Sequence, residues 1–148
     1  SVVAEAEIAR RSGHVTALHD PTEGGLASAV RELATVSAAG VEIDAESVPI
    51  LAETRAVADA LGIDPLGMLA SGSLLIATRA EGVPGLLRDI EAAGIPVTVV
   101  GRLTDDPDEA SLISGGKRRP LPEFAVDEVA RLLSQVGADR TSSPAPNS

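Results

Sequence analysis

Hydrophobic and polar residues follow one another along this chain in two kinds of pattern, and the changes between them predict alternating helices and strands. Patterns typical of amphipathic helices occupy five segments: 2–11, 26–37, 51–61, 86–93 and 126–136. Runs that alternate with period two or stay apolar throughout, as strands do, occupy 14–18, 41–44, 73–78, 95–103 and 110–113. Four of the helical segments end near a glycine, at Gly13, Gly40, Gly62 and Gly94.

Strands that alternate with single helices favour an α/β or α+β fold, with helices layered on a sheet in a partly ferredoxin-like, split βαβ arrangement. We expect one folded unit over residues 14–136. Residues 1–13 predict a helix that enters this unit from a longer chain, because it begins without a cap or a starting methionine. Ser, Pro, Asn and Asp dominate from 137 onward, so 137–148 is predicted to be a disordered tail. A tight hairpin is expected at 114–117.

Composition restricts both the core and the partners. The chain has 148 residues, 44% of them hydrophobic, but Phe124 is its only aromatic residue, so Val, Leu, Ile and Ala must form the core. A formal net charge of -10 repels polyanions, which argues against nucleic acid as a partner. The absence of cysteine excludes thiolate chemistry within these residues. No apolar run is long enough to cross a bilayer, so we expect a cytoplasmic protein that does not bind membranes.

The most informative segment is His19-Asp20-Pro21-Thr22-Glu23-Gly24-Gly25-Leu26, between a predicted strand and a predicted helix. Asp20 as N-cap, proline at the next position and Glu23 in capping-box position are typical of a helix start. Two glycines in a first helical turn are costly, so something must approach the backbone closely there. It is either a tightly packed partner strand or a ligand, and helix N-terminal amides favour an anion.

Most of the other candidate residues have two possible interpretations. His19 beside Asp20 is a candidate acid–base or metal ligand, although adjacent residues at a strand end usually point apart. His14 is expected on the surface. The acidic run 105–109 is either a solvated loop or a site for a hard cation, and Lys117-Arg118-Arg119 is either a solvated turn or a phosphate contact. Two histidines without cysteines indicate no metal cluster.

An ordered series of short motifs resembles a known domain. It comprises Asp20-Pro21-Thr22 with Gly24-Gly25-Leu26, then Gly40-Val41-Glu42-Ile43, Val48-Pro49-Ile50, Leu61-Gly62-Ile63-Asp64-Pro65-Leu66, Ser71-Gly72-Ser73-Leu74-Leu75-Ile76 and Gly94-Ile95-Pro96-Val97. The series resembles the C-terminal domain of the aminoimidazole ribonucleotide synthase superfamily, from about residue 15 to 103 and more weakly to 116. Within it, the hydrogenase-maturation carbamoyl dehydratase branch and its synthase-related neighbours are the most similar.

The resemblance implies a homodimer of two-domain chains that acts on a small-molecule substrate. An N-terminal domain of the same protein would hold ATP and magnesium, and this chain alone would bind neither and would not be catalytic. The shared chemistry uses ATP to phosphorylate an amide-type oxygen. By position, Asp20, Thr22, Gly24 and Gly25 would line the cleft that binds substrate and phosphate, with Ser71 and Gly72 on a second turn. Valine at either of the paired glycines is then expected to abolish ligand binding while the fold survives.

A second interpretation is a non-catalytic binding or dimerisation module with the same fold. Three features favour it. The chain has no cysteine, whereas the maturation branch ends in one; none of its residues resemble the N-terminal ATP-binding domain; and position 23 is Glu where that branch has arginine. The retained motif around Asp20 and Gly24-Gly25 favours the enzyme. Purine-pathway or selenophosphate-type synthase chemistry is a third alternative within the same superfamily.

Overall fold

The computed structural model describes residues 2–22, 24–68, 70 and 72–141 and has an α+β fold, which confirms the predicted class. The helices are α1 (Val3–Arg11), α2 (Gly25–Val36), α3 (Ala52–Leu61), α4 (Val83–Ala92) and α5 (Glu128–Thr141), with short 3-10 turns η1 (Pro65–Gly67) and η2 (Ala80–Gly82). The strands are β1 (Val15–His19), β2 (Gly40–Asp44), β3 (Leu75–Thr78), β4 (Gly101–Thr104), β5 (Ala110–Ser114) and β6 (Lys117–Pro120).

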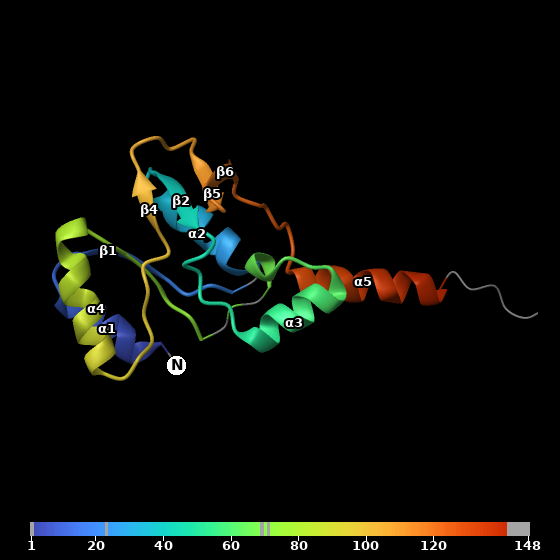
Figure 1. Ribbon diagram of the computed structural model, residues 1–148, viewed down its shortest axis with the longest axis horizontal. Helices are drawn as coiled ribbons and strands as arrows, with labels where there is room; N and C mark the ends of the chain where they lie inside the picture. Colours follow the sequence, from blue (N-terminus) through green and yellow to red (C-terminus); the bar gives the residue numbers. More distant parts are fainter. Residues whose placement is uncertain (1, 23, 69, 71, 142–148) are drawn as a thin grey trace, which may run out of the picture.

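The strands belong to two sheets. β1 and β3 form an antiparallel two-stranded ribbon, and the larger sheet has the order β4-β2-β5-β6 with β2 and β5 parallel. Gly115 and Gly116 connect β5 to β6, which confirms the hairpin predicted there. Figure 1 shows the larger sheet next to α2, and α1 beside α4 in a separate part of the molecule.

The main core lies between α2 and the larger sheet. Its buried members are aliphatic, as the composition predicted: Ala27, Val30, Ala34, Val41, Ile43, Leu66, Leu112 and Leu121. Ala27 and Ala34 are small, so α2 lies close to the strands. A second buried cluster joins α1 to α4 through Ala9, Leu86 and Ile90.

The β1–β3 ribbon lies between these two cores. Leu75 packs against the α2 cluster, whereas the next residue, Ile76, packs against the α1–α4 cluster. Successive strand residues point to opposite faces, so both faces of the ribbon are covered by apolar side chains. This burial explains why β3 is a continuous apolar run, and it stabilises a ribbon that would be marginal alone.

The strand predicted over 95–103 is wrong for most of its length, because β4 begins only at Gly101. Residues 95–100 have no strand assignment. Ile95 and Val97 pack against the α1–α4 cluster, whereas Val100 packs against the α2 cluster. The segment therefore connects the two cores through its side chains, and this packing accounts for its apolar pattern.

The helix at the end of the chain is longer than predicted. It was expected to end at 136 with disorder from 137, but α5 continues to Thr141. Residues 142–148 lie outside the described residues. A helical backbone crosses an internal glycine at a cost of about 1 kcal/mol, so Gly137 does not have to end the helix.

Two acidic residues fix the beginning of α5. Asp127 Oδ1 accepts hydrogen bonds from the amides of Val129 (2.9 Å) and Ala130 (3.3 Å), as an N-cap does. The buried Glu128 carboxylate accepts two bonds from Arg131, at 2.8 and 2.9 Å. The hydrogen bonds from Arg131, joined by a backbone hydrogen bond from Asp64, lower the pKa of Glu128. Glu128 thus links α5 to the residue that precedes η1.

This link predicts a pH-dependent contribution to stability. The pKa of Glu128 is lower in the folded chain, so the stabilisation is complete above the ordinary carboxyl pKa and is lost as the pH falls through the folded value. Glu128→Gln should lower the free energy of unfolding by up to about 1 kcal/mol near pH 7 and by less near pH 3. Urea titrations at both pH values measure this, with Glu53→Gln on the exposed side of α3 as control. An equal loss at both pH values would contradict the prediction.

Candidate functional site

The two turns predicted to bind ligand leave the β1–β3 ribbon at the same end. His19 of β1 is paired with Leu75 of β3 in antiparallel register. Asp20–Thr22 follow the end of β1, and residues 72–74 precede the start of β3, so the two segments extend from neighbouring positions. Asp20, Thr22 and Gly72 are exposed there, while Pro21 between them is fully buried and anchors its turn. Ser71 and Glu23 lie outside the described residues.

The predicted helix start at Asp20 is wrong. Helix α2 begins at Gly25, and its N-cap is Gly24, in the left-handed conformation with φ 75° and without a side-chain cap. Asp20 and Pro21 instead belong to the segment that connects β1 to α2. The left-handed Gly24 separates that segment from the helix, so the capping signal lies several residues before the helix it was assigned to.

The segment that approaches the paired glycines belongs to this chain. A Cβ on Gly25 would lie 2.5 Å from the carbonyl oxygens of both Leu66 and Met68. A Cβ on Gly24 would lie 2.3 Å from Ser28 Oγ and 3.3 Å from the Phe124 carbonyl oxygen. The structure therefore has packed protein in contact with these glycines, but the contacts come from η1 and the Phe124 backbone, not from the partner strand that the sequence offered as one alternative. Their small size allows α2 to begin against η1.

Gly72 has the opposite environment. Its φ is 90°, and a Cβ at this position would meet no atom within 4 Å. It is exposed on the turn before β3, so its backbone is open to an incoming molecule. Among the predicted glycines that the structure describes, Gly72 is the one whose surroundings suit a ligand.

Residues 121–125, which we call the strap, cross over the first half of α2. The Phe124 ring packs on Gly67, where a Cβ would lie 2.6 Å from ring carbons. Arg31 of α2 donates to the Leu121 carbonyl and lies 3.3 Å from Glu123. A hollow of about 460 Å³ between the strap and α2 is lined by Ser28, Arg31, Glu32, Glu123, Phe124 and Ala125. Sequence reasoning missed this cluster, and the only signal for it was that Phe124 is the sole aromatic residue.

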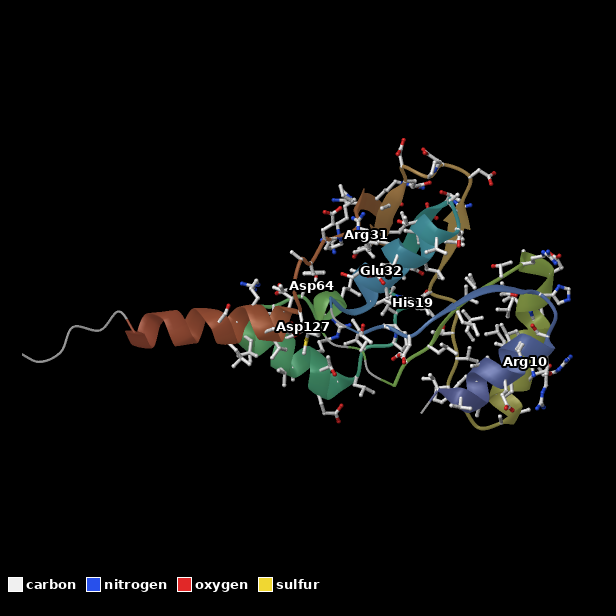
Figure 2. All side chains as sticks on the ribbon, turned by 180° about the vertical axis from the view of Figure 1, so that it is seen from behind. Arg10, His19, Arg31, Glu32, Asp64 and Asp127 are labelled. Atoms are coloured by element: carbon white, nitrogen blue, oxygen red, sulfur yellow. The ribbon has the colours of Figure 1, made fainter. Side chains whose placement is uncertain are left out.

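His19 points toward α2 and pairs with a residue that the sequence did not indicate. Its Nε2 lies 2.8 Å from Glu32 Oε2. Figure 2 shows the two side chains close together, with Arg31 on the same helix. Asp20 is exposed, in line with the expected alternation at a strand end. The structure therefore exposes Asp20 and places His19 beside a carboxylate of α2.

Comparison with known proteins supports the resemblance inferred from the motifs. The family model described as AIR synthase related protein, C-terminal domain, matches residues 2–113. The chain belongs to this family. The carbamoyl dehydratase HypE of Rhizobium leguminosarum bv. viciae is 33% identical over 101 residues, which are 67% of this chain and 29% of that protein. The phosphoribosylformylglycinamidine synthase subunit PurL of Corynebacterium aurimucosum is 35% identical over 123 residues, 83% of this chain and 14% of that protein.

Solved structures show the same fold. A crystal structure of the E. coli hydrogenase maturation protein HypE matches with a TM-score of 0.78 and 24% identity, and covers 88% of this chain and 42% of that chain. A crystal structure of HypE in complex with ATP matches with a TM-score of 0.67 and 23% identity, over 78% and 38% of the two chains. The AIR synthase related domain thus spans less than half the length of the relatives it matches.

The end of the family match separates two parts of the structure. β6, the strap and α5 all follow residue 113, whereas both candidate turns lie within the matched range. The basic cluster Lys117-Arg118-Arg119, expected as a solvated turn or a phosphate contact, lies in strand β6. Arg118 pairs with Glu42 and Glu109 across the outer face of the larger sheet. Arg102 lies 3.0 Å from Glu42, and its hydrogen bond is the main cause of the lowered pKa of Glu42.

The remaining candidates have structural partners. In the acidic run, Asp106 Oδ1 accepts from the Asp108 amide at 3.1 Å, and Asp108 is exposed. No three His, Cys, Asp or Glu side chains converge on a metal position among the described residues. His14, expected on the surface, is half-buried against Gly82. Within the described ranges, no helix has both the length and the apolar content needed to cross a bilayer.

The packing of Gly25 predicts a specific loss of stability. Gly25 and Gly62 share a φ of 64°, but a Cβ on Gly62 would meet no atom within 4 Å. Gly62→Ala should therefore cost only backbone strain, about 1 kcal/mol, whereas Gly25→Ala should cost at least about 2 kcal/mol. Chemical denaturation of the two variants measures the difference. Equal losses of stability in the two alanine variants would contradict this prediction. The same geometry predicts that Gly25→Val unfolds the chain, whereas the sequence led us to expect that the fold survives this substitution.

Proposed function

We propose that this chain supplies the substrate- and phosphate-binding half of an ATP-dependent enzyme that activates an amide-type oxygen by phosphorylation, in hydrogenase maturation. The observation that carries the proposal is the register of β1 with β3, because it places Asp20, Thr22 and Gly72 at one end of the ribbon. The relatives described as carbamoyl dehydratase HypE support the reaction class.

The exposed groups at this end suit a polar, partly anionic ligand. The Thr22 hydroxyl can donate a hydrogen bond to a phosphate oxygen, and the open backbone at Gly72 allows close approach. The Asp20 carboxylate can accept a hydrogen bond from the N–H of an amide substrate. Ser71 would add a second hydroxyl next to Gly72. Gly24 and Gly25 contribute by fixing the turn that carries Asp20 and Thr22.

ATP and magnesium are assigned to an N-terminal domain of the same protein, in a homodimeric cytoplasmic enzyme. The described residues contain no cluster of metal-binding side chains, so no step is assigned to a metal on this chain. Fixed hydrogen-bond donors facing the transferred phosphoryl group are the contribution expected of this half, since positioning and electrostatics dominate such reactions. The similarity to a HypE crystal structure in complex with ATP supports the use of ATP.

The experiment begins with the protein as its own cell makes it. We expect an intact mass of about twice 15.0 kDa, since a further domain adds about 100–150 residues. ADP formation is then measured with ATP and a panel of primary carboxamides and thiocarboxamides. Asp20→Asn and Thr22→Val should each lower kcat/KM about 100-fold, while Asp59→Asn on the exposed side of α3 should not change it.

Two results would contradict the proposal. One is full activity in both the Asp20→Asn and the Thr22→Val enzymes. The other is an intact mass of 15.0 kDa without amide-dependent ADP formation, which would identify a non-catalytic binding or dimerisation module.

A further inference from the structure

The strap is anchored at both of its ends. At its start, the Leu121 side chain is buried in the main core, and the Leu121 amide donates to a carbonyl of β5 at 2.8 Å. Beyond its end, the buried Glu128 carboxylate accepts a hydrogen bond from the backbone of Asp64, the residue that precedes η1. Figure 1 shows this segment running from β6 to the beginning of α5. Phe124 therefore lies between two fixed points.

Phe124 contacts two elements at once. Its ring packs on Gly67 of η1, where a Cβ would lie 2.6 Å from ring carbons. Its carbonyl oxygen accepts a hydrogen bond from Ser28 Oγ of α2 at 3.4 Å, and it would lie 3.3 Å from a Cβ on Gly24, the N-cap of α2. One residue of the strap thus contacts both η1 and the first turn of α2.

The first turn of α2 and η1 also contact each other, and this contact leads to the candidate site. Gly25 packs against the backbone of Leu66 and Met68. The Gly25 amide donates to the Thr22 carbonyl at 3.4 Å, and Thr22 is one of the exposed groups to which we assign the ligand. A continuous series of contacts therefore runs from Phe124 through η1 and Gly25 to Thr22.

An aromatic ring suits this position in the strap. Phe124 is half-buried and is the only aromatic residue of the chain. A ring covers the backbone at a glycine over a larger area than the aliphatic side chains of this chain can. Without it, the backbone at Gly67 is uncovered and η1 is held less firmly against Gly25. A displacement of about 1 Å at a binding group can lower a reaction rate about 100-fold, so a small shift of this junction has a measurable effect.

We infer that Phe124 is a positioning residue of the candidate site: by holding η1 against Gly25, it fixes the turn that carries Asp20 and Thr22. The inference rests on the proposed function. Phe124 follows residue 113, where the family match ends, so the support for the turn comes from outside the matched part of the domain. Phe124 acts through Gly25 and not by contact with a substrate.

The test uses the complete polypeptide and the amide-dependent ADP assay. Phe124→Ala should raise the KM for the amide about 10-fold and change kcat less than about 3-fold, because a displaced turn weakens the binding of substrate and transition state alike. Phe124→Leu still covers part of Gly67 and should recover most of the loss. The matched control is Val126→Ala, which removes an apolar side chain that is 54% exposed and should leave KM unchanged.

Amide hydrogen exchange gives a second readout, which does not require turnover. The Gly25 amide donates to the Thr22 carbonyl and the Gly67 amide to the Asp64 carbonyl, at 3.4 and 3.1 Å. Both amides should exchange about 10-fold faster in Phe124→Ala, because the junction opens locally more often. The amide of Ile90, in the separate α1–α4 cluster, should exchange at the wild-type rate.

Three results would overturn the inference. One is an equal acceleration of exchange at Gly25, Gly67 and Ile90, because Phe124 would then serve overall stability alone. The second is a wild-type KM in Phe124→Ala; if Thr22→Val loses activity in the same assay, the proposed function stands without the role of Phe124. The third is that no amide promotes ADP formation, which overturns the proposed function and the inference together.

Discussion

The close contact between Gly25 and the backbone of η1 is the constraint on which the rest of the structure depends. The carbonyl oxygens of Leu66 and Met68 lie where any larger residue would place its Cβ. The contact fixes the position at which α2 begins. It thereby also fixes the path of the segment that connects β1 to α2. Because η1 also leads toward β3, the same contact relates the two turns that extend from the ribbon. The strap reinforces this junction, since the Phe124 ring covers Gly67 of η1.

The paired glycines at this junction have a different role from the residues next to them in the chain. Gly24 and Gly25 are buried and act through packing, whereas Asp20, Thr22 and Gly72 are exposed at the rim. The proposed function uses these exposed positions to bind ligand. This chain spans less than half the length of the HypE relatives that it matches.

Predictions from the sequence were correct where the local pattern and the tertiary packing favour the same conformation. The helix that contains Val30, the hairpin at Gly115-Gly116 and the aliphatic core were all predicted, because each depends on neighbours in the chain or on composition. It failed at Asp20, where a good capping signal precedes a left-handed glycine, and at Ile95–Val100, where apolar residues pack on two cores without pairing as a strand. In both places a distant part of the chain overrides the local preference.

The sequence by itself determined that this is an α+β domain of the AIR synthase related family, with a motif that joins a strand to a glycine-led helix. It also determined that something must lie close against Gly24 and Gly25, because glycine is costly in a helix unless space is needed. Only the tertiary structure decided what occupies that space and which residues meet: η1 against Gly25, Phe124 against Gly67, and Glu32 against His19. These contacts join residues that are 13 to 57 positions apart in the sequence. The periodicity of a helix or strand relates only near neighbours in the chain, so it cannot indicate contacts between residues this far apart.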